Sequence, residues 1–247
     1  MKQIIKLEGL VLKTTDYKEE GVLATILTKN GINNSIIKGA KKMASGTRLL
    51  ASPLTKLEFN ATSTEGLNTL TEGIILDNYL SIKQNYNKIT HAFPIIEKIL
   101  TFAHQVTNNK TFYTFVNNII NMLKEDLDEF TILTLFEVKL TYLIGISPEL
   151  KTCIRCGDTT NEGSFSIYQG GIICNKCNTL MPYDLNVEET KNLKLLYLIK
   201  LDKVNSEFIK IVKKDIKNIN MVIDKHYEKH LDFKSKSKQV LRQMETK

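Results

Sequence analysis

The sequence predicts an α+β fold, in which a small N-terminal β-barrel precedes an α-helical region that carries a separate four-cysteine insertion. Three observations along the 247-residue chain support this prediction. The first eighty residues are rich in short β-branched segments, several of which alternate between apolar and polar residues. Helical periodicity takes over from about Asp77, and all four cysteines lie between residues 153 and 177.

Five short segments of the N-terminal region are expected to be β-strands. They are Glu8–Thr14, Val22–Thr28, Ser35–Lys38, Leu54–Phe59 and Leu67–Thr71. Asn30-Gly31 is a strong hairpin signal between the second and third strands, and a longer connection (residues 39–52) precedes the fourth. This pattern fits a Greek-key barrel of the OB type, and an SH3-like barrel would show a similar pattern.

The helical region is expected to form a bundle around residues 130–144, which are apolar nearly all round. Asn186 with Glu189 three residues later predicts a helix start with a capping box. A final amphipathic helix is expected from about Ser206 to Leu231, with a loosely ordered tail after it. We therefore expect an OB domain at residues 1–80 and a helical domain at residues 81–247, with the cysteine insertion at about 151–181.

The cysteines form two identical steps, Cys153-Ile-Arg-Cys156 and Cys174-Asn-Lys-Cys177, with seventeen residues between them. This is the ligand spacing of a four-thiolate zinc ribbon. Residues 165–174 are expected to form a hairpin that turns at Gly170-Gly171 and returns the second pair to the first. Because four thiolates complete a tetrahedral shell, we expect one structural Zn²⁺ per chain, bound by Cys153, Cys156, Cys174 and Cys177.

Two other uses of the cysteines are possible. Two disulfides would need an oxidising compartment, but residues 1–8 contain no long apolar run, so we expect no secretory signal and a cytoplasmic protein with reduced thiols. A redox CxxC would explain one pair and leave the other unused. No transmembrane helix is expected either, because Glu137 and Lys139 interrupt the most apolar stretch.

The net charge of +7 indicates an anionic partner such as nucleic acid or an acidic protein tail. Residues 37–57 contain no acidic residue, and their cations suit binding to a phosphate backbone; a merely solvated basic loop is the alternative. The candidate nucleic-acid-binding residues are Lys38, Lys41, Lys42, Arg48 and Lys56. Aromatic stacking partners are scarce, since only Tyr17, Phe59 and Tyr79 precede residue 80.

A second basic set shares one side of the last predicted helix, and a solvated polar face explains it better than a binding role does. Its members are Lys210, Lys213, Lys214 and Lys217. His226 and His230 are spaced as in zinc metalloproteases, but Tyr227 occupies the position of the required Glu. The sequence contains no Walker A, GxGxxG or GxSxG motif. We therefore expect no catalytic residues and no enzymatic activity.

Several segments, in their order along the chain, resemble the bacterial RecO family of recombination mediators. They are Gly9-Leu-Val-Leu-Lys-Thr-Thr-Asp-Tyr17, Leu27-Thr-Lys-Asn-Gly31, Lys38-Gly-Ala-Lys-Lys42, Leu133-Thr-Leu-Phe-Glu137 and Leu143-Ile-Gly-Ile-Ser-Pro-Glu-Leu150, which leads into Cys153. The resemblance implies an OB domain followed by a helical domain with the zinc ribbon. It also places basic groups of the OB face at Lys38, Lys41, Lys42 and Arg48, with Lys41-Lys42 replacing arginines common in the family.

The resemblance further implies binding to single- and double-stranded DNA and non-enzymatic annealing of complementary strands. The implied partners are RecR, the C-terminal tail of single-strand-binding protein (SSB), which would dock on the helical domain, and indirectly RecA, which is loaded onto SSB-coated strands. Such a protein would be cytoplasmic and associated with the nucleoid during repair. A zinc-ribbon transcription or RNA-binding factor is the main alternative, and an enzyme that uses the ribbon as a scaffold is a third.

Overall fold

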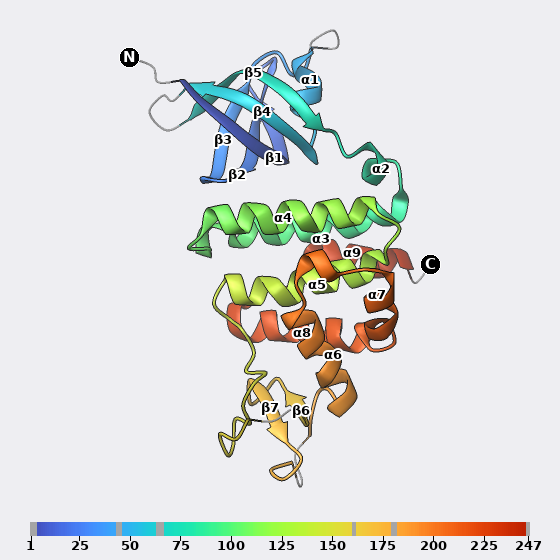
Figure 1. Cartoon of the computed structure of the whole chain (residues 1–247). Coiled ribbons are helices and arrows are strands. Elements are labelled where there is room, and N and C mark those ends of the chain that lie inside the picture. Colours follow the sequence, from blue (N-terminus) through green and yellow to red (C-terminus); the bar gives the residue numbers. More distant parts are fainter. Residues whose placement is uncertain (1–3, 43–45, 63–66, 160–161, 179–181, 246–247) are drawn as a thin grey trace. The chain divides into compact units, whose positions relative to one another are not determined.

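The computed structural model describes residues 4–42, 46–62, 67–159, 162–178 and 182–245. The chain divides into two compact units (Figure 1). The first comprises Met1–Ile89 and Ile96–Lys124, and the second comprises Thr90–Ile95 and Glu125–Lys247. The domain boundary expected near residue 80 stays a prediction.

A closed five-stranded barrel forms the centre of the first unit (Figure 1). Its strands are β1 (Ile4–Tyr17), β2 (Gly21–Thr28), β3 (Gly31–Ile37), β4 (Thr55–Thr62) and β5 (Asn68–Asp77). The order around the barrel is β1-β2-β3-β5-β4, in which β3 and β5 run parallel and β4 pairs with β1 to close the ring. This is the OB-type Greek key, so the predicted barrel type and all five predicted strands are confirmed.

Alternation along the strands builds the barrel core. Along β4, Leu57, Phe59 and Ala61 are buried while their neighbours are partly exposed, as a period of two requires. Gly9 on β1 allows a close approach of strands, because a Cβ there would lie 2.5 Å from Cγ2 of Ile26 and 2.9 Å from the Leu27 carbonyl oxygen. A side chain at this position would therefore push β1 away from β2.

The predicted hairpin between β2 and β3 is confirmed, but its turn lies one residue earlier than expected. Thr28 pairs with Gly31, so the two loop residues are Lys29 and Asn30. Gly31 has a φ of +103° and stands where the strand resumes. This is the glycine position of a bulged hairpin, and it explains why Asn-Gly marked the turn without forming its centre.

Helices complete the first unit. They are α1 (Thr47–Leu50), α2 (Leu80–Lys83), α3 (Tyr86–Phe102, which also contributes residues 90–95 to the second unit), the 3₁₀ turn η1 (Ala103–Gln105) and α4 (Asn109–Lys124). Helix α4 lies against β2 and β3. The Tyr113 hydroxyl donates to Glu8 Oε1 at 3.0 Å, and Lys124 pairs with Asp77 at 2.6 Å. These two polar contacts attach the helix to the barrel.

The second unit is a helical bundle with a two-stranded ribbon (Figure 1). It contains α5 (Glu129–Leu143), β6 (Gly163–Ser166), β7 (Gly171–Cys174), α6 (Val187–Leu198), η2 (Leu201–Lys203), α7 (Ser206–Lys213), α8 (Ile216–Leu231) and α9 (Lys236–Glu245). Helix α5 is buried on nearly all sides and contacts α6, α7 and α8, as predicted. The capping box of Asn186 and Glu189 at the start of α6 is also confirmed.

Two predictions for the C-terminal part are wrong. The expected helix from Ser206 to Leu231 breaks at Lys214–Asp215, where the Asp215 carboxylate accepts a hydrogen bond from Asn192 of α6. The tail after Phe233 is not loosely ordered but contains α9, which Ser235 caps by accepting from the Lys238 amide at 3.1 Å. Lys238 is buried and pairs with Glu137 of α5 at 2.9 Å, a partner 101 residues away.

Throughout the part of the chain that the structure describes, every helix is too short or too polar to cross a lipid bilayer.

Candidate metal centre and nucleic-acid face

The four cysteine sulfurs meet at one point of the ribbon. Their Sγ atoms all lie within 4.8 Å of one another, and Cys156 and Cys174 are 3.9 Å apart. A tetrahedral four-thiolate site with Zn–S bonds of about 2.3 Å has sulfur–sulfur edges of about 3.8 Å. All four residues belong to the described part of the chain and are free thiols, so the disulfide alternative is not realised. The set can hold one metal ion.

Each CxxC step is a tight turn. The Gly157 amide donates to the Cys153 carbonyl at 2.8 Å, and the Cys177 amide donates to the Cys174 carbonyl at 3.0 Å. Gly157 has a φ of +76°, a left-handed conformation that glycine adopts without strain. Because each turn brings two sulfurs to one side, the hairpin needs only to place the two turns side by side.

The hairpin is confirmed, but its predicted two-residue turn at Gly170-Gly171 is wrong. Gly171 pairs with Ser166 as a strand residue, and residues 167–170 form the loop, in which Gly170 has a φ of +84°. Gly171 is required for packing instead, since a Cβ there would lie 2.7 Å from the Glu149 carbonyl oxygen. The sequence predicted a turn at both glycines but did not distinguish the positive φ of Gly170 from the close packing of Gly171.

Backbone amides favour ionisation of one of the sulfurs. Burial raises the pKa of the Cys153 thiol, but amide hydrogen bonds from Cys174, Cys156 and Arg155 outweigh burial and lower this pKa to about 6. By contrast, hydrogen bonds among neighbouring sulfurs raise the pKa of Cys177 to about 12. Four clustered sulfurs cannot all ionise without a cation among them, which is the chemistry expected of a metal-binding set.

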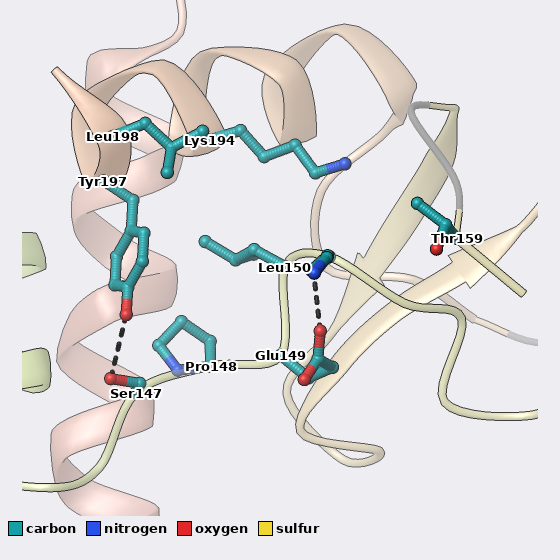
Figure 2. Close-up of a pocket in the computed structure, with 9 residues that line it drawn as sticks. Ser147, Pro148, Glu149, Leu150, Thr159, Lys194, Tyr197 and Leu198 are labelled. Atoms are coloured by element: carbon teal, nitrogen blue, oxygen red, sulfur yellow. Dashed lines mark hydrogen bonds between the residues drawn. The ribbon is translucent and has the colours of Figure 1, made fainter. Parts of the chain in front are cut away.

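The base of the ribbon is tied to the segment that follows α5. Glu149 exchanges backbone hydrogen bonds with Gly170 and Ile172, and its carboxylate accepts from the Lys151 and Thr152 amides at 2.7 and 2.8 Å. A hollow of about 490 Å³ lies beside this segment. Figure 2 shows Tyr197 of α6 donating to Ser147 across it, with Lys194 extended along its edge. This hollow contains none of the sequence-predicted site residues.

The predicted nucleic-acid-binding residues differ in whether their side chains already form ion pairs with carboxylates. Lys38 and Arg48 are exposed, and within residues 4–42, 46–62 and 67–124 neither makes an ion pair. Lys41 pairs with Asp16 at 2.9 Å, and Lys42 pairs with Glu20 at 2.9 Å. Residues 43–45 of the predicted basic stretch lie outside the described residues.

Lys56 has a different environment from the other four cations. It lies on β4, is half-buried and pairs with Glu8 at 3.0 Å. Glu8 also accepts from Tyr113, and its pKa is lowered because its bonds to Lys56 and Tyr113 outweigh the opposing effect of burial. Lys56 is therefore paired with the same carboxylate that binds Tyr113 of α4, and its predicted role in nucleic-acid binding stays a prediction.

Sequence reasoning missed the carboxylates that face the basic segment. Antiparallel pairing of β1 with β2 and of β2 with β3 places the β1–β2 turn and the end of β3 at the same end of the barrel. The Lys41 amide donates to the Glu20 carbonyl at 3.1 Å, which joins the two segments directly. A search along the sequence alone finds no acid between residues 37 and 57, whereas the predicted strand order would have revealed Asp16 and Glu20.

The second basic set is partly paired as well. Lys213 contacts Asp128 at 2.7 Å, which raises the lysine pKa, and Lys214 contacts Glu188 at 3.3 Å. His226 is buried, its Nε2 lies 2.6 Å from the Ile146 carbonyl oxygen, and burial lowers its pKa. The His226 and His230 ring centroids lie 4.3 Å apart with the rings tilted by 46°, but among the described residues only the cysteines bring three or more metal ligands together.

Comparisons with known proteins agree with this architecture. Residues 1–79 match the family model described as recombination protein O, N terminal, and residues 83–239 match that for its C terminal. The DNA repair protein RecO of Bacillus pumilus is 29% identical over 246 residues, which cover 98% of this chain and 95% of the relative.

Two further relatives carry the same name. The DNA repair protein RecO of Bacillus subtilis strain 168 is 28% identical over 98% of this chain and 96% of its own length. That of Oceanobacillus iheyensis is 28% identical over 97% of this chain and 93% of its own length. Because the two family models account for both the barrel and the helical part, the chain belongs to the RecO family of DNA repair proteins.

Proposed function

We propose that this protein is a non-enzymatic mediator of DNA repair and homologous recombination, which binds single- and double-stranded DNA at one end of its barrel and anneals complementary strands. The observation that carries this proposal is the gathering of Lys38, Lys41, Lys42 and Arg48 at one end of an OB-type barrel, two of them without ion pairs among the described residues. Such a face neutralises phosphates without reading bases.

The ion pairs of Lys41 and Lys42 do not prevent this role. Asp16 is 85% exposed, and both Lys42 and Glu20 are more than half exposed. Exposed ion pairs are worth only about 0–1 kcal/mol, so closely spaced phosphates can replace the carboxylates. Lys38 and Arg48 would make the first contacts, and Lys41 and Lys42 would follow once their carboxylates are displaced.

Annealing follows from charge neutralisation. Two strands that are both bound through phosphates repel each other less, and their bases remain free to pair because the protein contacts the backbone. No bond is made or broken by the protein, which accords with the absence of a catalytic motif in the sequence.

We further propose that the ion held by Cys153, Cys156, Cys174 and Cys177 is Zn²⁺. The set consists of four cysteine sulfurs within 4.8 Å of one another, and four thiolates would fill a tetrahedral shell without an open position, as in structural zinc sites. The role of the ion would be to hold the two turns of the ribbon together. Residues 160–161 and 179–181 of the predicted ribbon lie outside the described residues.

The proposed partners are RecR, the C-terminal tail of SSB and, indirectly, RecA, in a cytoplasmic setting. Family membership supports them, and no residue of these interfaces is assigned.

The decisive experiment combines two measurements on the purified chain. We expect faster annealing of bare complementary strands and co-purification with RecR and SSB. Selective affinity for RNA without annealing would instead favour a transcription or RNA-binding factor, and turnover of a substrate would favour an enzyme.

A further inference from the structure

An open hollow of about 740 Å³ lies at the end of the barrel that carries the basic residues. Its wall comes from three places: the β1–β2 turn, the end of β3 and the start of β5. The lining includes Tyr17, Lys18, Gly21, Ile36, Lys38 and Thr69. β3 and β5 pair here in parallel, with Ile36 opposite Thr69, so paired sheet forms this part of the lining. The volume is within the about 300–1,000 Å³ typical of sites for small ligand groups.

Tyr17 supplies an accessible aromatic ring to this hollow. The other two aromatic residues before residue 80, Phe59 and Tyr79, are each 1% exposed and cannot stack on a ligand. Tyr17 ends β1 and is only partly buried. The Lys18 ammonium group lies 5.5 Å from its ring centroid, which places a cation beside one face of the ring.

The charges around the hollow favour a neutral planar group inside and phosphates at its edge. The lining contains two cations, Lys18 and Lys38, and two acids, Glu19 and Glu20, so its formal charge sums to zero. Lys38 and Arg48, which make no ion pair within the described residues, lie close to each other. Lys38 belongs to the lining, and the Thr47 hydroxyl, next to Arg48, donates to the Lys38 carbonyl at 3.3 Å.

From this arrangement we propose that the hollow accepts one nucleobase of a single strand, stacked on Tyr17, while the adjoining phosphates lie at Lys38 and Arg48. The inference rests on the proposed function and adds a base contact to it. A base in duplex DNA is already stacked and paired, so the contact is available only to single strands. Base–aromatic stacking is tolerant of sequence because every base offers a π-face.

The test uses the full chain and a fluorescent oligothymidine. Tyr17→Leu should weaken single-strand binding by about 5- to 100-fold, the range of one stacked base, and Tyr17→Phe should bind like the wild type. Duplex affinity and the salt slope should stay unchanged, because no phosphate contact is lost. Tyr168→Leu is the matched control, since Tyr168 is exposed on the ribbon with Lys229 6.0 Å from its ring.

A second measurement needs no variant, so the proposal stays testable if Tyr17→Leu fails to fold. An abasic oligonucleotide of the same length should bind the wild-type chain more weakly by a similar factor, with the same salt slope. Equal affinity for the abasic and thymidine strands, or equal losses by Tyr17→Leu on single strands and duplex, would overturn the stacking site.

A different experimental result would contradict the proposed function. If Lys38→Gln with Arg48→Gln leaves both affinity and salt slope unchanged, the barrel end is not the DNA face. If that double variant loses affinity while the Tyr17 and abasic experiments show no effect, the DNA face stands and the base site alone is wrong.

Discussion

The salt dependence of DNA binding provides the sharpest test of the barrel face. The perturbation is Lys41→Gln with Lys42→Gln, which removes two cations and leaves the backbone bond from Lys41 to Glu20 available. Lys56 is held by Glu8, so the structure leaves four cations for phosphates: Lys38, Lys41, Lys42 and Arg48. At about −0.7 per phosphate on single strands, the slope of log affinity against log salt should be near −2.8.

In the double variant we expect this slope to flatten by about 1.4, to near −1.4, with all sequences weakened alike. The assay is fluorescence anisotropy across a salt series, with thermal unfolding as a check of the fold. The matched control is Lys210→Gln with Lys217→Gln, which makes the same change of charge on α7 and α8. An unchanged slope in the variant of Lys41 and Lys42, together with a flattened slope in the control, would refute the barrel end as the DNA-binding face. The DNA site would then lie in the second unit.

The remaining predictions concern metal, partner binding, ion pairing and the C-terminal helix. Metal analysis should find one zinc per chain, and Cys174→Ser should lower the unfolding temperature before it alters DNA affinity; zinc-free protein with four titratable thiols in the folded state would contradict this. Lys41→Glu with Lys42→Glu should lose DNA binding but keep binding to an SSB tail peptide, and a parallel loss of both would show that the two sites are not separate. Asp16→Asn with Glu20→Gln should raise single-strand affinity by about 2- to 30-fold, since DNA no longer displaces two exposed ion pairs; an unchanged affinity would mean that Lys41 and Lys42 do not reach phosphates. Lys238→Met should lower the free energy of unfolding by about 3 kcal/mol in urea denaturation, because Glu137 would stay buried without its cation, whereas Lys225→Met on the exposed side of α8 should have little effect.

If the barrel end binds DNA as proposed, its ion pairs would affect the release of strands as well as their binding. Asp16 and Glu20 would then compete with phosphates for Lys41 and Lys42. A face that neutralises its own cations in this way binds less tightly than one with four free cations. Moderate affinity suits annealing, because the paired product has to leave the protein.

Local patterns were enough to predict much of the fold. Strand β4 alternates between buried and partly exposed residues, and α5 is buried on nearly all sides. The capping box of Asn186 and Glu189 spans four consecutive residues, so it too can be recognised from a short stretch of sequence. The gathering of the four cysteines was predictable for the same reason, since each CxxC turn is local and the hairpin between the two turns is short.

Turn positions were harder to predict, because glycine has more than one use. At Gly31 and Gly170 a positive φ is required, while at Gly171 the requirement is space for the Glu149 backbone. The sequence marks all of these positions as glycine and does not distinguish conformational freedom from close approach. Only the pairing register shows whether a given glycine is needed for its positive φ or for close packing.

Thus the sequence by itself determined the barrel strands, the central helix, the gathering of the four cysteines and the family. The tertiary structure decided which charges are free, since Asp16 and Glu20 meet Lys41 and Lys42 only through the strand order, and Lys238 meets Glu137 across 101 residues. It also decided which of the three aromatic rings before residue 80 stays accessible, because Phe59 and Tyr79 are buried and Tyr17 is only partly buried. Charge pairing and exposure depend on segments that are distant along the chain, and local periodicity carries no information about them.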